Sequence, residues 1–417
     1  MGTFVFANAR PAVPFSYDGG AERTTFEILS GLARKGVSLI QISAYQQGEV
    51  AARNAASMGM VPIKDVGDID YGHFRICSRR EHLLVRNGSL SIIGVDPSEF
   101  QIVCRDIVTQ LKPAVLVTWL KGSDYVVELG NELKVPTVLR IVGPDSLEGF
   151  PRVNPDTIIL ANSPATAQIS SEYYNRKVDF LLGVIDHEAH VAADRTPEFV
   201  TYINPRQEKG IHLFCKIAGL LPALPFLVVR GWSRTNLQRD ELRAMEFLSS
   251  LPNVTVSSPL SDMREIYRLT SILLLPSRWP EAWARVIGEA QANGIPVIAS
   301  NRGSSPQSVG EGGIILDYGD PRLWASTIRM LYEDGDLRSQ LGDYAKLNTK
   351  RFDSDALIEE YLEALSAFAA GRPRVINQPI GKVKNFCSRR DAQGKVHIEA
   401  LMIGMNAAFD LSEPAHP

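Results

Sequence analysis

The segment SILLLPSRWPEAWARVIGEAQANGIPVIAS, residues 271–300, decides the predicted fold. Its ends, SILLLPS (271–277) and IPVIAS (295–300), have the length and the branched aliphatic content of buried strands. Between them lie apolar residues at helical spacing and a glycine stop signal: Trp283, Val286, Ile287, Ala290 and Gly294. A strand, a crossover helix and a second strand form a β-α-β unit, from which parallel sheets are built.

The same alternation runs through most of the chain. Before residue 187, the predicted strands are 3–8, 37–44, 114–120, 136–143, 157–163 and 179–185, and the predicted helices are 24–36 and 123–133. After a polar segment, 187–198, which we interpret as a linker, the predicted strands are 199–205, 226–232, 253–259, 271–277, 295–300 and 312–317, and the predicted helices are 210–222, 261–270, 322–333 and 355–370.

This pattern predicts an α/β protein with two doubly wound, Rossmann-like domains that face each other across a cleft. The predicted domains are 1–187 and 188–352, followed by a helix at 353–370 and a C-terminal extension at 371–417. A ligand is expected at the carboxyl ends of the strands.

Composition excludes several classes of function. The chain has 417 residues, of which 45% are hydrophobic and 22% charged, as in ordinary soluble proteins of two domains. A net charge of −3 disfavours a general nucleic-acid binder. No apolar run is long enough to span a bilayer, and the N-terminus lacks the basic region of a signal peptide, so a cytoplasmic location is expected. Cys77, Cys104, Cys215 and Cys387 lack metal or redox spacing.

The central segment holds two carboxylates. Glu281 is predicted in the loop at the carboxyl end of the first strand, and Glu289 on the flank of the apolar helix stripe. The N-terminus of that helix offers free N–H groups and the positive end of the dipole, which suits a phosphate. Glu289 would lie about 9 Å further along the axis, where it could accept from the vicinal hydroxyls of a ribose. Spacing alone is also compatible with an exposed amphipathic helix that has two ordinary glutamates.

The context of these glutamates resembles the donor-site signature of family 4 glycosyltransferases (glycosyl transferases group 1), which have the GT-B fold. That signature is a glutamate, seven residues, a glutamate and Ala-x-Ala-x-Gly-x-Pro-Val. It is matched by Glu281, Glu289, Ala290, Ala292, Gly294, Pro296 and Val297. The resemblance covers residues 1–370 and includes a Gly-Gly-x-Glu-Arg loop, a Gly-Val-x-Asp motif and a Lys-Gly pair: Gly19, Gly20, Glu22, Arg23, Gly183, Val184, Asp186, Lys209 and Gly210.

The resemblance implies transfer of a sugar from a nucleotide-diphosphate sugar to an acceptor hydroxyl, with retention of configuration and without a metal or other cofactor. The first domain would bind a small-molecule, glycan or lipid-linked acceptor, the second the donor, and the helix at 353–370 would cross back to the first. Glu289 would hold the ribose and Glu281 would contact the donor sugar near the reacting centre. Lys209, with Arg206, would neutralise the diphosphate. These cations lie where charge develops as the sugar–phosphate bond breaks.

Further site residues follow from the same resemblance. Gly20, beside Gly19, would bring a backbone N–H close to the donor, since a side chain would block that approach. The remaining donor-site candidates are Trp283, Ala284, Arg285, Val286 and Leu260. Arg140 and Asp145 are the candidates on the acceptor side.

The chain departs from the family pattern at four places. Ala282, Trp283 and Ala284 replace Gly-aromatic-Gly; Ile203 and Asn204 replace Gly-Arg; Val142 stands near the usual histidine; and Gly303, Ser304, Ser305, Pro306 and Gln307 replace Gly-Gly-x-x-Glu. Two alternatives therefore stay open: a sugar-nucleotide epimerase of the same fold, and a non-catalytic paralogue that acts as a binding or scaffold subunit.

Three other features favour ordinary structural roles. His187 and His190 are three residues apart, which does not match the H-E-x-x-H zinc motif, so we interpret them as part of the polar linker. The basic segment 74–86 is interpreted as a solvated loop or helix face, although it could meet an acidic acceptor or a membrane surface. Trp119 and Trp232, at strand ends, could stack on a sugar or pack in the core. The absence of G-x-G-x-x-G disfavours a nicotinamide-dependent dehydrogenase.

Overall fold

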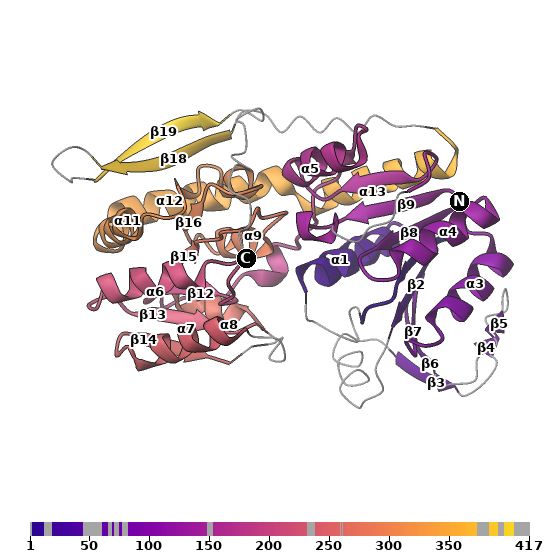
Figure 1. Ribbon diagram of the computed structural model, residues 1–417, viewed down its shortest axis with the longest axis horizontal. Helices are drawn as coiled ribbons and strands as arrows, with labels where there is room; N and C mark the ends of the chain where they lie inside the picture. The colour runs from indigo at the N-terminus through magenta and orange to yellow at the C-terminus, as the bar shows by residue number, and fades with distance from the viewer. Residues whose placement is uncertain are drawn as a thin grey trace. The chain divides into compact units, whose positions relative to one another are not determined.

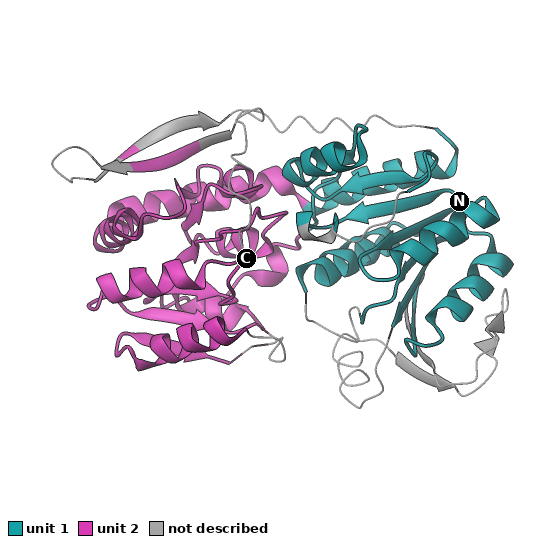
Figure 2. Cartoon of the chain, viewed as in Figure 1, with its two compact units in different colours: residues 1–184, 354–378 teal, residues 185–353, 379–417 magenta. Residues whose placement is uncertain are grey.

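The computed structural model describes residues 2–11, 19–44, 61–65, 69–70, 75–76, 82–147, 153–231, 238–258, 260, 262–372, 383–390 and 396–403. The chain forms two compact units, coloured separately in Figure 2. The first consists of residues 1–184 and 354–378, and the second of residues 185–353 and 379–417. Within the described residues, no helix combines the length and apolar character that a membrane crossing requires.

The first unit is built on a nine-stranded sheet in the order β11-β10-β9-β8-β1-β2-β7-β6-β3 (Figure 1). Its strands are β1 (Phe4–Asn8), β2 (Leu39–Ala44), β3 (Val61–Asp65), β6 (His82–Asn87), β7 (Leu90–Val95), β8 (Val115–Trp119), β9 (Thr137–Ile141), β10 (Ile158–Ala161) and β11 (Asp179–Phe180). Its helices are α1 (Gly20–Arg34), α3 (Phe100–Leu111), α4 (Ser123–Leu133), α5 (Pro164–Tyr174), α13 (Ser354–Ala369) and the 3₁₀ turn η1 (Pro144–Leu147). The pairing is parallel except at β6, which runs antiparallel to β7 and β3.

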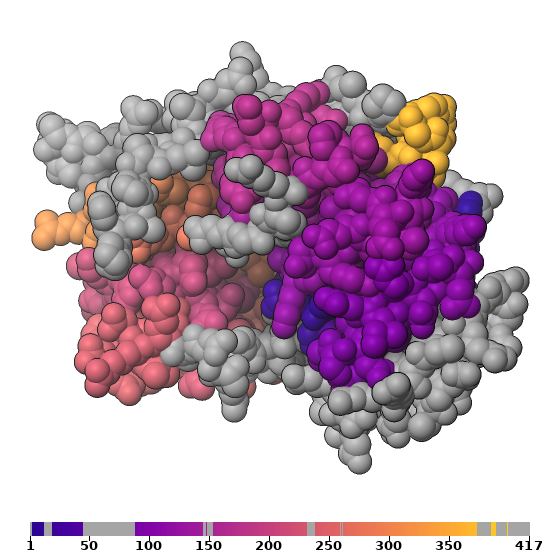
Figure 3. Space-filling view, turned by 45° about the vertical axis from the view of Figure 1, so that its right-hand side comes forward, coloured from indigo at the N-terminus to yellow at the C-terminus, as the bar shows by residue number. Residues whose placement is uncertain are grey.

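Helices cover both faces of this sheet. On one face, Val5, Ala7 and Leu116 pack with α3 and α4. Alternation along the strands turns their neighbours to the opposite face, which α1 and α13 cover. These two helices touch closely, because a Cβ added at Gly31 of α1 would lie 2.5 Å from the Ile358 side chain of α13. On the face of the molecule shown in Figure 3, the segments from β7 to α5 make up most of the described surface of this unit.

The second unit contains an eight-stranded sheet in the order β14-β13-β12-β15-β16-β17-β18-β19. Its strands are β12 (Phe199–Ile203), β13 (Phe226–Val229), β14 (Val254–Ser257), β15 (Thr270–Leu275), β16 (Val297–Ser300), β17 (Gly313–Leu316), β18 (Val383–Arg390) and β19 (Val396–Ile403). Its helices are α6 (Ile211–Leu220), α7 (Arg239–Ser250), α8 (Arg264–Leu269), α9 (Arg285–Ala292), α10 (Ser305–Val309), α11 (Pro321–Glu333) and α12 (Gly335–Thr349), with 3₁₀ turns η2 (Glu188–His190) and η3 (Lys350–Phe352).

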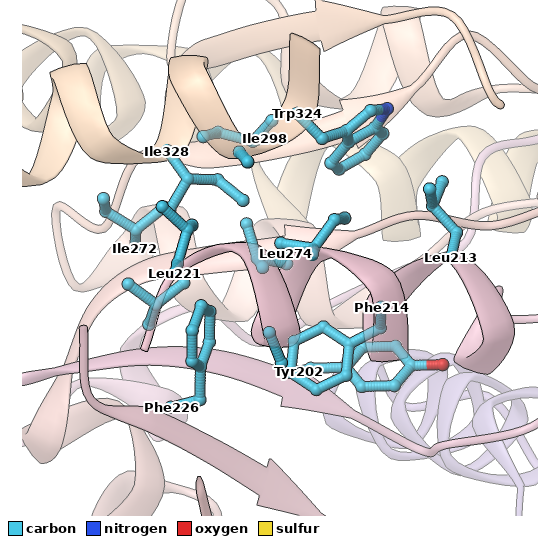
Figure 4. Packing of buried hydrophobic residues seen from close by; sticks show 14 of the residues in the cluster. Tyr202, Leu213, Phe214, Leu221, Phe226, Ile272, Leu274, Ile298, Trp324 and Ile328 are labelled. Carbon is cyan, nitrogen blue, oxygen red and sulfur yellow. The ribbon is translucent and has the colours of Figure 1, made fainter. Parts of the chain in front are cut away.

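Aromatic and aliphatic side chains fill the core between this sheet and its helices (Figure 4). Phe214 of α6 lies at the centre, stacked on Tyr202 at 4.4 Å and edge-on to Phe226 at 5.5 Å between ring centroids. Trp324 of α11 is fully buried in the same cluster. This packing fixes α6 against β12, and so places the loop that joins them.

Both sheets have a point at which the chain reverses its direction of travel across the sheet. In the first unit β1 lies between β2 and β8, and in the second β12 lies between β13 and β15. At such a switch point the loops after two neighbouring parallel strands diverge and leave a crevice at the carboxyl ends. The ends of β1 and β8, and those of β12 and β15, are therefore the expected ligand sites.

The α/β, doubly wound fold predicted from the sequence is confirmed, with several local differences. The segment 187–198 is not a free linker, since Arg195 donates to the carbonyls of Thr270 and Asn293. The prediction of a loop or helix face for the basic segment 74–86 is wrong, because two strands occupy much of it. These are β6 and the short strand β5 (Arg75–Ile76), which pairs with β4 (Ile69–Asp70). The C-terminal extension contains β18, which pairs in parallel with β17, and β19, which pairs antiparallel with β18.

Candidate functional site

An ion pair stands at the switch point of the second sheet. Lys209 follows β12, and Glu281 follows β15, the next strand across. Lys209 Nζ lies 2.7 Å from both carboxylate oxygens of Glu281. The Glu281 side chain is 6% exposed and that of Lys209 is 32% exposed, so the lysine side chain is partly open to solvent while the glutamate side chain is buried. The site therefore combines the positive charge of Lys209 with the buried negative charge of the Glu281 carboxylate.

The backbone brings these two loops together. Gly210 has φ +82°, and a Cβ there would lie 1.7 Å from the Pro276 carbonyl oxygen, so only glycine allows this approach. The carbonyl of Glu208 accepts from the backbone N–H groups of Arg278 and Trp279 at 3.0 and 3.1 Å. Together these contacts join the β12–α6 loop to the β15–α9 loop.

Glu281 is held from a second direction by Ser277. The Ser277 hydroxyl, fully buried, donates to Glu281 Oε1. In turn, Ser300 at the end of β16 donates to the Ser277 carbonyl at 2.6 Å. The backbone of Glu281 pairs with the loop after β16, since its carbonyl accepts from Ser304 N at 2.7 Å. The carboxylate thus has a fixed orientation.

Arg206, the second predicted cation, is oriented by α7. Its Nη1 lies 3.3 Å from Glu241 Oε2, and Glu241 also accepts from the backbone N–H groups of Gln207 and Gln238, each at 2.8 Å. Glu241 is 2% exposed. Arg206 is therefore three residues before Lys209 in sequence but pairs with a different carboxylate, that of Glu241.

Glu289 lies inside a polar cluster rather than on an open helix flank. Its Oε2 accepts from the Tyr267 hydroxyl at 2.6 Å, and its Oε1 accepts from Arg285 Nε at 3.2 Å. His190 Nε2 is 3.5 Å from the same Oε1. The whole side chain is 3% exposed. A ribose diol would have to share this carboxylate with the groups that already contact it.

The helix that carries Glu289 starts later than predicted. α9 begins at Arg285, because the preceding backbone is extended: Glu281 pairs with Gly303, and Ala284 has ψ 97°. Trp283 is therefore outside the helix, and Glu289 lies about 6 Å from its start rather than 9 Å. The buried face also includes Arg285 and Glu289, in addition to Ile287 and Ala290.

The other predicted donor residues surround this helix start. Trp283 packs edge-on against Phe352 at 5.1 Å between ring centroids. Ala284 is the N-cap residue of α9, and Val286 is half-buried against the cluster around Ile287. Leu260 packs on Leu227 and Val229 of β13 and on Ile266 of α8. Of these, Ala284 and Arg285 share the helix start near Glu281, and Leu260 belongs to a separate apolar cluster.

The predicted residues of the first unit gather at the end of its own sheet. Gly19 is the N-cap residue of α1 and Gly20 its first residue; a Cβ at Gly19 would lie 2.0 Å from a Glu22 carboxylate oxygen. Arg140, at the end of β9, is 4% exposed. Asp145 lies in η1, but its side chain is outside the described residues, as is Trp232.

Trp119 is a core residue. It is fully buried and contacts the ring of Phe6 edge-on at 6.5 Å between centroids. Stacking of its ring on a sugar is therefore not supported.

The histidines near the unit boundary do not form a metal site among the residues described. His190 Nδ1 contacts the carbonyl of Asp186 at 2.7 Å. Burial, with smaller contributions from the positive charges of His190 and Arg285, lowers the pKa of His187 to about 4. No group of three or more histidine, cysteine or acidic side chains suited to a metal occurs in the part of the chain that the structure describes.

The sequence reasoning missed four residues that shape the site: Ser277, Glu241, Tyr267 and His190. The Pro-Ser pair before Glu281 is the one local signal, since Ser277 ends the predicted strand. Glu241 and Tyr267 come from helices distant in sequence, and their contacts depend on tertiary packing.

Comparison with known proteins finds a family similarity in the second unit. Residues 185–348, within the second unit, match the model of glycosyl transferases group 1. The D-inositol 3-phosphate glycosyltransferase of Corynebacterium jeikeium is 31% identical over 154 residues, which are 36% of this chain and 36% of that protein. Across the curated relatives compared, the match spans 21% to 47% of their length.

Similarity to solved structures extends over both units. A glycosyltransferase from Rickettsia africae has a TM-score of 0.65 at 16% identity, covering 88% of this chain and 98% of that one. The Anabaena protein HepE, solved in complex with UDP, has a TM-score of 0.63 at 15% identity, covering 88% and 100%. At this identity the likeness shows the fold, which is the GT-B fold that the sequence resemblance implied.

Proposed function

We propose that this protein is a retaining, metal-independent glycosyltransferase that moves a sugar from a nucleotide-diphosphate sugar to an acceptor hydroxyl. The observation that carries the proposal is the Lys209–Glu281 ion pair at the switch point of a group 1 domain. The second unit binds the donor and the first unit binds the acceptor. UDP in the HepE structure and the names of the curated relatives support a nucleotide-sugar donor.

The chemistry requires stabilisation of a leaving nucleoside diphosphate. Its negative charge grows as the sugar–phosphate bond breaks, and Lys209 supplies an ammonium on a partly exposed side chain there. The first N–H groups of α9, beside Ala284, add a second source of positive potential. With these groups in place, the leaving phosphate oxygen can take the acceptor proton, and no metal ion is needed to neutralise the charge.

Glu281 has a different role, because its carboxylate is buried and fixed by Lys209 and Ser277. It orients the ammonium toward the diphosphate and, once the ammonium turns to the donor, accepts from hydroxyls of the transferred sugar. Glu289, held by Tyr267 and Arg285, is the proposed partner of the ribose.

The test is calorimetric titration with a panel of nucleoside diphosphates in EDTA, on the wild type and on Lys209→Ala. We expect one nucleotide to bind the wild type and to bind the variant at least about tenfold more weakly. The matching nucleotide sugar is then incubated with candidate acceptors, and the anomeric configuration of the product is read by NMR. Absence of nucleotide binding would favour a non-catalytic scaffold, and conversion of the donor without acceptor would favour an epimerase.

A further inference from the structure

The switch point of the first sheet carries a cluster that the donor chemistry does not use. Ala7 pairs in register with Thr118, and Trp119 pairs in register with Arg140. Asn8, Trp119 and Arg140 therefore form one row across β1, β8 and β9, and register partners in neighbouring strands point to the same face. Each is at or next to the carboxyl end of its strand, where a doubly wound sheet binds ligands.

Arg140 is a buried cation whose described surroundings contain no carboxylate partner. It is 4% exposed, and no carboxylate among the described residues pairs with it. Its Nη1 donates to Thr25 Oγ1 of α1 at 2.9 Å, and its guanidinium lies 5.9 Å from the ring centroid of Tyr361 of α13. One neutral hydroxyl and one aromatic ring recover only part of the free energy lost on desolvating a guanidinium, which has five N–H donors.

The two neighbours of Arg140 in the row also hold unused donors. Asn8 Nδ2 and Trp119 Nε1 are buried and have no hydrogen-bond partner among the residues that the structure describes. The Asn8 amide is already oriented, because its Oδ1 accepts from the backbone N–H of Arg10 at 2.8 Å. Buried polar groups are nearly always paired in folded proteins, so two donors without a described partner, in the same row as a cation without a described carboxylate, indicate a missing acceptor.

We infer that Asn8, Trp119 and Arg140 form a phosphate-binding site in the first unit, and that the acceptor substrate carries the phosphate. The amide, the indole and the guanidinium come from three adjacent strands, and together they offer enough N–H donors to satisfy several oxygens of a phosphate. The anion site stands on the geometry of the first unit alone. Its assignment to the acceptor rests on the proposed glycosyltransferase function.

The site is tested by NMR of protein labelled with ¹⁵N-tryptophan, titrated with inorganic phosphate. The Trp119 indole N–H resonance is identified by its loss in Trp119→Phe. We expect phosphate to shift this resonance in the wild type and in Lys209→Ala, which lacks the donor-site cation, but not in Arg140→Met. Arg105→Met removes a surface arginine, paired with Glu132, from the same unit and should leave the shift intact.

The inference is overturned if phosphate does not move the Trp119 resonance, or if the shift survives in Arg140→Met and disappears in Lys209→Ala. If Arg140→Met does not fold, Asn8→Ala serves as the second variant, with phosphate affinity expected to fall about tenfold. Nucleoside diphosphate binding by the second unit is measured on the same samples. If the wild type binds no nucleoside diphosphate but phosphate still shifts the Trp119 resonance, the proposed function is rejected and the anion site is kept.

Glycerol phosphate and vesicles containing phosphatidic acid then separate the two sources of such a group. A Trp119 shift with glycerol phosphate supports a small phosphorylated acceptor. A Trp119 shift with the vesicles but not with glycerol phosphate, while inorganic phosphate still binds, supports a lipid-linked acceptor that carries the phosphate.

Discussion

Lys209 Nζ lies 2.7 Å from each oxygen of the Glu281 carboxylate, so one ammonium bridges both oxygens. The two side chains come from loops after adjacent strands, and each determines where the other lies. Their effects on activity should therefore depend on one another. Loss of either leaves the remaining charge unpaired in a site where Glu281 is 5% exposed.

The first prediction concerns this coupling. Lys209→Ala and Glu281→Ala should each lower kcat about 100-fold or more, because each removes part of one electrostatic unit. The double variant should be scarcely worse than either single variant, since groups that act together are strongly non-additive. Steady-state kinetics of the four proteins measure the interaction. Multiplicative losses would show that the two residues act independently.

The second prediction assigns Ser277 a positioning role. Ser277→Ala removes the hydroxyl that donates to Glu281 Oε1 but keeps the backbone carbonyl that accepts from Ser300. We expect kcat to fall about tenfold, as for loss of one hydrogen bond to a charged group, with little change in the KM for the donor. Ser277→Thr, which keeps the hydroxyl, should restore part of kcat.

Ser326→Ala is the matched control, because Ser326 lies on α11 and its hydroxyl donates to the Arg322 carbonyl. A parallel rise in KM and fall in kcat for Ser277→Ala, with an equal loss of stability, would mean that Ser277 only supports the fold.

The third prediction compares two glycines at α6. Gly210→Ala should destabilise the second unit by about 2 kcal/mol or more, because φ +82° disfavours alanine and the new methyl would overlap the Pro276 carbonyl. Gly219, inside α6, has nothing within 4 Å of an added Cβ. Gly219→Ala should therefore stabilise by up to about 1 kcal/mol. Urea unfolding of both variants gives the two values, and similar effects at the two positions would contradict the close approach of the loops.

How far the sequence predicts this protein depends on the range of the interactions. The strands 271–277 and 295–300, and the placement of Glu281 between them, are local signals and are found at β15 and β16 within a few residues. The start of α9 is not determined by local sequence signals. The bridge between Glu281 and Gly303, two loops apart in sequence, keeps the chain extended up to Ala284 and delays the helix.

The same limit applies to the charged side chains. Glu241 contacts Arg206 only because α7 packs beside α6, and the local sequence around either residue does not predict this ion pair. Arg140 in the strand 136–143 is predicted from the resemblance as an acceptor-side candidate. Its burial without a carboxylate partner among the described residues depends on the packing of α1 and α13 over it. The strand β18 contains the buried Asn385, whose amide donates to the Pro306 and Gly310 carbonyls in the folded unit.

The last prediction is a pH dependence that originates at His187. Burial lowers its pKa from 6.5 to about 4, and its Nε2 has no hydrogen-bond partner in the described structure. Between these two pH values the unfolded chain binds a proton at His187 and the folded chain does not, so stability falls as the pH drops from 6.5 toward 4. At pH 5 the loss should be about 2 kcal/mol relative to pH 7. His187→Gln should remove this part of the pH dependence, whereas a substitution of the exposed His212, His212→Gln, should not. Urea unfolding at pH 7 and pH 5 measures the difference, and equal losses in the wild type and His187→Gln would place the acid sensitivity elsewhere.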